Sequence, residues 1–213
     1  MNILVTGANG FLASHLIPAL LKKEGVSICG TYRKETGRLI QDPTTGLTYE
    51  YCDLSKISDV TGLFKKYRFD AIIHTAGAIS TRNDYAYLEQ SIRDNMAGQA
   101  NLVSEAIKGG CKIYIFCSSM AIYGDSTKRS SGFREDDAAE PREVYGWSKS
   151  AAEELLRVQT EQQQGMRGVT LRLAGIHGLG RQGGAVYNMI HSAVSGEEVV
   201  INEPESRFRF LFV

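Results

Sequence analysis

The stretch LVTGANGFLASHL, Leu4 to Leu16, places small residues at regular intervals between an apolar run and an amphipathic run. Gly7, Gly10 and Ala13 form a G-x-x-G-x-x-A spacing, which is typical of the first strand-to-helix turn of a dinucleotide-binding βαβ unit. Such a turn lets backbone amides approach a pyrophosphate and directs the positive end of a helix at that anion. The stretch therefore predicts a bound dinucleotide, while a plain tight turn, which also needs glycine, is the simpler alternative.

Composition limits the classes of protein that the chain can belong to. Its 213 residues suffice for one substantial domain, and 24 basic side chains balance 24 acidic ones without a basic stripe, so nucleic acid is not an expected partner. The cysteines lie in apolar runs without C-x-x-C spacing, which predicts buried thiols and no metal site; they are Cys29, Cys52, Cys111 and Cys117. No run reaches the ~18 apolar residues of a membrane span, and no leader precedes the first predicted strand. We expect a soluble, cytoplasmic protein that does not bind membranes.

Short apolar runs rich in β-branched residues alternate with longer segments of helical period, a pattern that indicates βαβ units. The predicted strands are Asn2–Thr6, Val26–Tyr32, Leu47–Cys52, Ala71–Thr75, Lys112–Ser118 and Val169–Leu173, of which the last two read as strands buried on both faces. The predicted helices are Phe11–Glu24, Ser55–Tyr67, Asp84–Lys108 and Val144–Gln164. Right-handed crossovers then give an α/β fold, a doubly wound parallel sheet with helices on both faces.

The end of the second predicted strand is where this type of fold distinguishes its cofactors. An acid there binds the ribose 2′-hydroxyl of NAD, and a basic residue nearby accepts the 2′-phosphate of NADP. The segment ICGTYRKETGR has no acid at the strand tip, whereas Arg33, Lys34 and Arg38 follow it. This favours NADP as the cofactor, with NAD and a merely solvated basic loop as alternatives. Asp53, after the third predicted strand, is a candidate for bonding the adenine amino group or for capping the next helix.

The segment VYGWSKSAAEELL carries the predicted acid–base chemistry. Tyr145 and Lys149 are four residues apart, so both side chains lie on one face of a helix. A tyrosine normally ionises near pH 10, but an ammonium within about 4–6 Å favours the phenolate and can also hold ribose hydroxyls. Ser119 follows the fifth predicted strand at the sheet edge that binds ligands, where its hydroxyl can stabilise a substrate oxygen.

Motifs along the whole chain resemble the extended short-chain dehydrogenase/reductase family, which includes nucleotide-sugar epimerases and dehydratases with a Rossmann-type fold. The matching segments are TGANGFLASHL, DLS, HTAG, NMAGQANLVSEA, CSSMAIYGD, YGWSK and LRLAGIHGLG. The resemblance implies a catalytic set of Ser119, Tyr145 and Lys149, with Asn95 supporting the proton relay. Together with the basic residues above, it implies that the dinucleotide is bound by Gly7, Asn9, Gly10, Phe11, Leu12, Arg33, Lys34, Asp53, Leu54, Ala76, Gly77 and Lys149. His74 is interpreted as a packing residue.

Two departures from the family pattern concern the substrate. Similar proteins usually carry asparagine at the position of Gly175 and tyrosine at that of His177, near the diphosphate or sugar. The final segment ESRFRFLFV resembles a strand after which relatives continue into a substrate lobe. We therefore expect a dinucleotide-binding Rossmann domain over residues 1–174 and, over 175–213, the start of a truncated substrate lobe that is largely missing. Dinucleotide binding should then survive better than turnover.

The predicted function is that of an NAD(P)-dependent epimerase, dehydratase or reductase that acts on a nucleotide sugar by hydride transfer with tyrosine acid–base catalysis. Its expected partners are this small-molecule substrate and a second copy of the chain in a homodimer. Two alternatives stay open. GTYRK resembles the strand tip of NADP-dependent reductases of small carbonyl compounds. A non-catalytic dinucleotide-sensing regulatory protein could share the scaffold, but such sensors tend to lose the Tyr–Lys pair.

Overall fold

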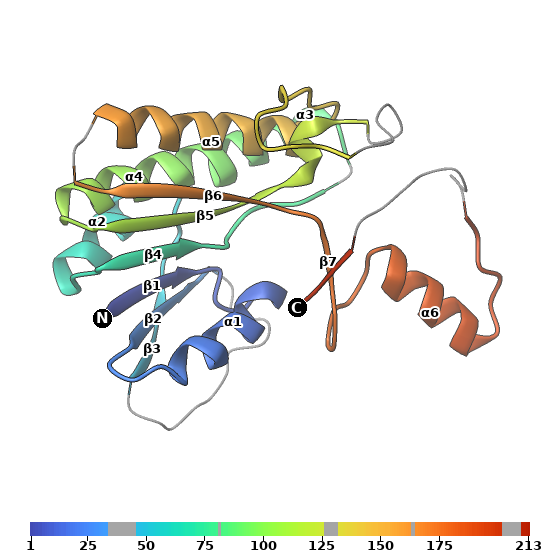
Figure 1. Ribbon diagram of the computed structural model, residues 1–213, viewed down its shortest axis with the longest axis horizontal. Helices are drawn as coiled ribbons and strands as arrows, with labels where there is room; N and C mark the ends of the chain where they lie inside the picture. The colour runs from blue at the N-terminus through green and yellow to red at the C-terminus, as the bar shows by residue number, and fades with distance from the viewer. Residues whose placement is uncertain (34–45, 81, 126–131, 163–164, 202–209) are drawn as a thin grey trace.

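A computed structural model describes residues 1–33, 46–80, 82–125, 132–162, 165–201 and 210–213. Its main feature is a six-stranded sheet in the order β3-β2-β1-β4-β5-β6, with every neighbouring pair parallel (Figure 1). The strands are β1 (Asn2–Thr6), β2 (Ser27–Tyr32), β3 (Leu47–Tyr51), β4 (Ala71–His74), β5 (Ile113–Ser119) and β6 (Arg167–Leu173). The strand order reverses between β1 and β4, so the crevice that binds ligands in such sheets lies at their carboxyl ends.

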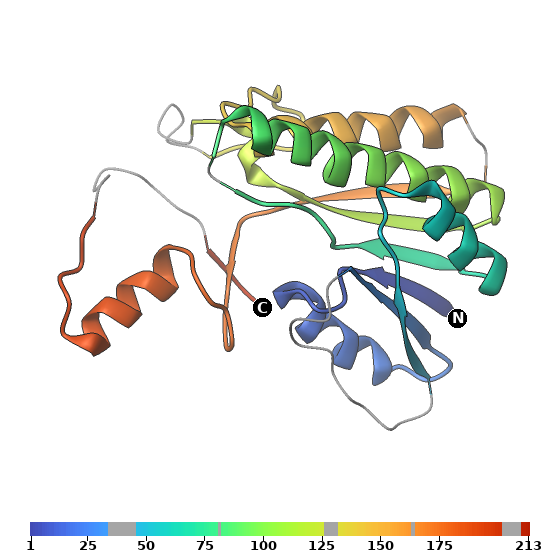
Figure 2. The ribbon, with the colours of Figure 1, turned by 180° about the vertical axis from the view of Figure 1, so that it is seen from behind.

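Helices cover both faces of this sheet, which confirms the predicted doubly wound fold (Figures 1 and 2). The helix α1 (Phe11–Leu21) lies on one face, and α2 (Ile57–Lys66), α4 (Gly98–Lys108) and α5 (Val144–Gln162) lie on the other. Because side chains alternate along a strand, Ile3 and Val5 of β1 pack with α1, whereas Leu4 packs in the core beneath the other three helices.

The helix predicted over Asp84–Lys108 is interrupted in its middle. It consists of α3 (Tyr85–Ser91), the π-helical segment η1 (Ile92–Ala97) and α4. Asp84 caps α3 by accepting a hydrogen bond from the backbone nitrogen of Tyr87 at 2.9 Å. Hydrophobic period alone cannot show a single wide turn, and π-helical turns often occur at functional sites. This one carries Asn95, a predicted site residue.

The prediction of two strands buried on both faces holds for β5 and is wrong for β6. Tyr114, Phe116 and Cys117 of β5 are buried. In contrast β6 has no buried residue, and Leu171 is 42% exposed. The cause is position, because β6 is an edge strand of the described sheet and pairs there with β5 alone.

Beyond the main sheet, two short strands form a separate parallel pair, β7 (Gly175–His177) and β8 (Phe210–Phe212). The strand expected near the end of the chain is therefore β8, whereas β7 and the helix α6 (Ala185–Ser195) were not predicted. Figure 1 shows α6 standing away from the six-stranded sheet, and none of its residues is buried. The division at residue 174 stays a prediction.

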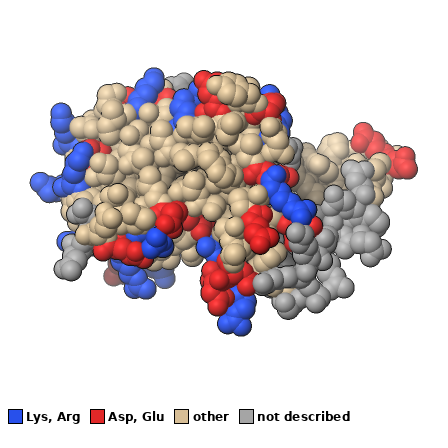
Figure 3. Space-filling model, turned by 90° about the horizontal axis from the view of Figure 1, so that it is seen from above, with Lys and Arg blue, Asp and Glu red and all other residues tan. Residues whose placement is uncertain are grey.

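The surface charges and the cysteines match the sequence-based expectation where they are described. Lys and Arg side chains alternate with Asp and Glu side chains on the face shown in Figure 3. The four cysteines are free and buried, as expected. Within the described residues, no three or more His, Cys, Asp or Glu side chains gather as a metal site would require, and no helix is long and apolar enough to cross a membrane.

Candidate functional site

The glycine turn between β1 and α1 has the shape that a pyrophosphate requires. Gly7 has φ +66°, and a Cβ there would come within 2.9 Å of the Ala76 Cα, so only glycine fits without strain. The backbone nitrogen of Gly10 donates to the Gly7 oxygen at 2.8 Å and closes the turn. The N-cap residue of α1 is Gly10, which lines the cavity, so the positive end of the helix faces the crevice. The turn therefore fits a dinucleotide.

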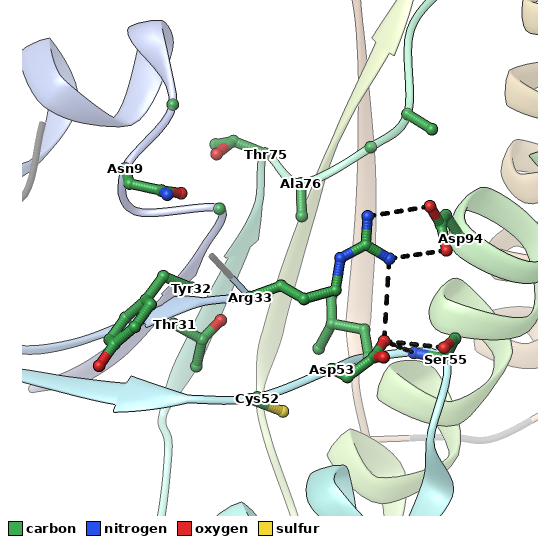
Figure 4. Close-up of a pocket in the computed structure, with 15 residues that line it drawn as sticks. Asn9, Thr31, Tyr32, Arg33, Cys52, Asp53, Ser55, Thr75, Ala76 and Asp94 are labelled. Atoms are coloured by element: carbon green, nitrogen blue, oxygen red, sulfur yellow. Dashed lines mark hydrogen bonds and ion pairs between the residues drawn. The ribbon is translucent and has the colours of Figure 1, made fainter. Parts of the chain in front are cut away.

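A cavity of about 320 Å³ opens at the carboxyl ends of β1, β2, β3 and β4 (Figure 4). Eight of the predicted cofactor residues line it: Gly7, Asn9, Gly10, Arg33, Asp53, Leu54, Ala76 and Gly77. Sequence reasoning missed Thr31, Tyr32, Cys52, Ser55, Thr75, Ala78 and Asp94, most of which follow a strand end and could have been found by that signal. Phe11 and Leu12 lie in the first turn of α1 without lining the cavity, and Lys34 lies outside the described residues.

Arg33 is already bound to a carboxylate inside this cavity. Its Nη1 and Nη2 atoms donate to the two oxygens of Asp94 at 2.8 and 3.0 Å, and Nη1 lies 3.9 Å from Asp53 (Figure 4). Burial pushes the pKa of Asp94 upward, but hydrogen bonds from Arg33 and Arg93 hold it below its usual value. Arg33, which the sequence predicted would bind a 2′-phosphate, is thus neutralised by Asp94. The sequence analysis did not identify Asp94 as part of the site.

Asp53 lines the cavity and also shapes the turn that follows β3. Its Oδ1 accepts hydrogen bonds from the backbone nitrogen of Ser55 at 3.1 Å and from the Ser55 hydroxyl at 2.7 Å. The N-cap position of α2 is Lys56, so Asp53 is not the helix cap considered as its alternative role. Its role toward adenine stays a prediction.

The structure brings Ser119 and Tyr145 together from distant segments. Ser119 ends β5, and its Oγ accepts a hydrogen bond from the backbone nitrogen of Ala121 at 3.1 Å. Tyr145 is the second residue of α5, and the Ser119 side chain lies near enough to its phenol to act to lower the Tyr145 pKa. One oxygen of a substrate could therefore contact both hydroxyls, as acid–base catalysis with an oxyanion donor requires.

Lys149 is buried one helical turn further along α5. Its Nζ donates to the Cys117 backbone oxygen at 3.0 Å and lies 6.0 Å from the centre of the Tyr145 ring. Burial lowers the pKa of Lys149 to about 8. The expected lowering of the Tyr145 pKa by Lys149 does not occur, since burial raises that pKa and the hydrogen bond with Ser119 opposes the rise. The Lys149 ammonium is directed at a backbone carbonyl. Burial has a larger effect on the Tyr145 pKa than the nearby polar groups have.

Asn95 connects the loop after β4 with α5. Its Oδ1 accepts from the Ala78 nitrogen at 2.7 Å, and its Nδ2 donates to the Ala78 oxygen at 3.0 Å and to the Ser148 Oγ at 2.9 Å. The Ser148 hydroxyl in turn donates to the Tyr145 backbone oxygen at 2.8 Å. Asn95 is thereby placed to hold the start of α5, and a part in a proton relay stays a prediction.

His74 is a packing residue, as the sequence indicated. It is 1% exposed, stacks on the Phe116 ring at 5.5 Å, and pairs through Nδ1 with the Thr6 Oγ1 at 2.6 Å. Burial, with a smaller contribution from Lys149, lowers its pKa to about 3. The imidazole is therefore neutral at physiological pH and serves the core.

Arg181 is a further residue at this site that sequence reasoning did not single out. Its guanidinium lies over the Phe11 ring at 5.3 Å, and its charge acts to lower the Tyr145 pKa. It comes from the glycine-rich segment GLGRQGG after β7, which gave no signal of its own. A third part of the chain thus reaches the region between α1 and Tyr145.

The sheet order, the glycine turn and the Ser–Tyr–Lys arrangement define the dinucleotide-binding class of doubly wound α/β proteins. The sequence profile of the NAD dependent epimerase/dehydratase family matches residues 3–213, and the chain belongs to this family.

Similar proteins with curated functions include several epimerases. UDP-glucose 4-epimerase 3 of Oryza sativa subsp. japonica is 29% identical over 191 residues, which cover 85% of this chain and 51% of the rice protein. UDP-glucose 4-epimerase of Vibrio cholerae is 28% identical over 84% of this chain and 53% of its own length. The chain thus spans about half the length of the curated relatives it matches.

Solved structures show the same fold. UDP-glucose 4-epimerase of Thermotoga maritima, solved with UDP-glucose, has a TM-score of 0.85 and 25% identity, covering all of this chain and 69% of the bacterial one. The Bordetella bronchiseptica enzyme WbmH, solved with NAD⁺, has a TM-score of 0.84 and 25% identity, covering 99% of this chain and 67% of that one.

Proposed function

We propose that the chain carries the dinucleotide-binding half of a nucleotide-sugar epimerase that works by reversible hydride transfer. The contact between Ser119 and Tyr145, beside a cavity formed by the glycine turn, is the observation on which the proposal rests. The relatives named as UDP-glucose 4-epimerases support the nucleotide-sugar substrate and the reaction type. The Tyr–Lys pair is present, with Lys149 buried and Tyr145 partly buried, which favours an enzyme over the dinucleotide-sensing alternative.

In the proposed reaction, the glycine turn and the residues that line the cavity would hold the dinucleotide, which would supply reversible hydride transfer at a sugar carbon. Tyr145 accepts the proton of the hydroxyl on that carbon as its C–H bond breaks, so the alcohol becomes a ketone. Ser119 donates a hydrogen bond to the same oxygen and stabilises it as its charge changes. Tyr145 returns the proton to that oxygen when the C–H bond forms again on the opposite face, which inverts the carbon.

We propose NAD as the cofactor, in place of the NADP expected from the sequence. Two observations favour it. The Arg33 guanidinium is engaged by Asp94 through both terminal nitrogens, and the WbmH structure contains NAD⁺. Lys34, the other basic residue behind the NADP expectation, lies outside the described residues. NADP remains the alternative that a titration must exclude.

Two measurements test this proposal. Calorimetry with NAD should give saturable binding to this chain, and NMR of UDP-glucose incubated with NAD and a longer form of the protein that carries the substrate lobe should show a second UDP-hexose without net formation of NADH. Net consumption of reduced cofactor together with a carbonyl compound would instead support the small-carbonyl reductase. Binding of NAD without any change in nucleotide sugars would support the sensor, and absence of NAD binding would overturn the proposal.

A further inference from the structure

The side chain of Arg33 leaves the end of β2 and points across the cavity toward η1 (Figure 4). Both carboxylate oxygens of Asp94 receive its hydrogen bonds, at 2.8 and 3.0 Å. Asp94 is also within 3.0 Å of Arg93 Nε, and its side chain is only 5% exposed. Asp53 adds a second carboxylate 3.9 Å from Arg33. Two cations and two carboxylates therefore meet at this end of the cavity.

We propose that Asp94 determines the dinucleotide preference of this protein by holding Arg33 away from the position of a 2′-phosphate. The inference deepens the proposed function, on which it rests, because it concerns the same cavity. It assigns a selecting role to a residue of the π-helical segment, far along the chain from the strand tip that usually makes the distinction.

The balance of charges gives the physical reason. A 2′-phosphate carries up to about two negative charges at neutral pH and would have to take Arg33 from Asp94. The exchange would leave a nearly buried carboxylate with Arg93 and a 3.5 Å contact from Gln90 Nε2. Removing one of its cations from a nearly buried carboxylate is costly, although Arg33 itself is 38% exposed. A ribose 2′-hydroxyl is uncharged, so it can bind without separating Arg33 from Asp94.

The position of the Arg33–Asp94 pair also fits a role in selecting between NAD and NADP better than a purely structural role. Arg33 and Asp94 both line the cavity, and their hydrogen bonds run along its wall. The pair lies at the end of β2, where the ribose of a dinucleotide is placed in this type of fold. Asp94 is adjacent to Asn95, so the π-helical turn carries both a residue that lines the cavity and one that binds the loop after β4.

The test compares NAD and NADP dissociation constants by calorimetry for wild type and for Asp94→Asn. The asparagine keeps the shape of the side chain and removes its charge, so the ratio of NADP to NAD affinity should rise about 10-fold. Adding Arg33→Gln to Asp94→Asn should abolish the gain. Asp84→Asn is the matched control, since Asp84, the N-cap residue of α3, pairs with Arg82 outside the cavity and should leave the ratio unchanged.

The variants Asp94→Glu and Asp94→Ser distinguish an effect of the lost charge from an effect of misfolding. The glutamate retains the charge and should keep the wild-type ratio, and the serine gives a second neutral variant should the asparagine variant misfold. An unchanged ratio in the neutral variants would overturn the inference, as would a wild type that prefers NADP. Both results leave the proposed function standing, whereas a wild type that binds neither dinucleotide overturns both.

Discussion

Lys149 directs its ammonium at the backbone oxygen of Cys117, 3.0 Å away, and is almost completely buried beneath α5. The contact ties the helix that carries Tyr145 to the strand that ends at Ser119. Burial lowers the pKa of Lys149 to about 8, and burial is also the largest effect on the Tyr145 pKa, which it raises. We therefore expect the Lys149 side chain to favour dinucleotide binding and to lower the stability of the fold.

Lys149→Met should weaken NAD binding and stabilise the fold. The pKa of Lys149 falls from 10.5 unfolded to about 8 folded, so the unfolded state binds more protons between these values and stability rises with pH across that window. Below it the buried charge costs about 3 kcal/mol, which the methionine avoids. Urea unfolding at pH 7 should show higher stability, and calorimetry about 10-fold weaker NAD binding. Lys112→Met, at an exposed position, should change neither, and unchanged NAD affinity in Lys149→Met would remove the lysine from the binding site.

Gly77→Ala should loosen the junction between the β4 loop and α5. A Cβ at this position would lie 3.2 Å from Lys149 Nζ and 3.3 Å from Asn95 Oδ1, so both polar groups must shift. We expect several-fold weaker NAD binding by calorimetry and a loss of about 1 kcal/mol in stability. Gly62→Ala is the matched control, because nothing lies within 4 Å of its added methyl group in α2 and it should stabilise the helix by about 1 kcal/mol. Equal effects of the two substitutions would argue against a special role for Gly77.

His74 should make the fold sensitive to mild acid. Its folded pKa, about 3, lies below the value of 6.5 in the unfolded chain, so the unfolded state binds the extra proton between these values. Stability is lost as pH falls below 6.5, by about 2 kcal/mol at pH 5. Urea midpoints at pH 7.5 and pH 5 should differ clearly in wild type and much less in His74→Gln. The same difference in both proteins would mean that other groups cause the acid sensitivity.

The sheet and its glycine turn were predictable because they depend on local patterns. Buried strands such as Ala71–His74 are written as apolar runs, and Gly7 is required by a positive φ within the turn itself. The position of Ser119 at the ligand edge followed from its place at the end of a parallel strand, and its grouping with Tyr145 was implied by the family resemblance. Each of these inferences needs only the residue types and their order.

Other features depend on distances between segments, which composition does not encode. The π-helical turn displaces Asp94 and Asn95 from the positions a regular helix would give them. Asp94 could not be assigned to Arg33 from sequence, since 61 positions separate them. The exposure of β6 reflects its place at the edge of the sheet, not its apolar sequence. The pKa values of Tyr145 and Lys149 depend on burial, which spacing along a helix cannot supply.

Tyr145→Phe tests the acid–base assignment most directly. The Ser119 side chain lies near the Tyr145 phenol, so both hydroxyls can contact one substrate oxygen. In a longer form of the protein that carries the substrate lobe, removing the proton carrier should lower turnover about 10²–10⁴-fold, while the NAD dissociation constant stays nearly unchanged. Tyr85→Phe removes a hydroxyl from a residue that is 78% exposed and should leave both quantities alone.

The pH profile gives a second readout of the same residue. Burial raises the pKa of Tyr145, and the Ser119 hydrogen bond and the Arg181 charge oppose that rise. If the phenolate is the base, kcat/KM should increase with pH toward that pKa, and Arg181→Met should move the rise to higher pH because one stabilising cation is lost. Wild-type turnover in Tyr145→Phe, or loss of NAD binding in that variant, would show that the phenol is not the acid–base group.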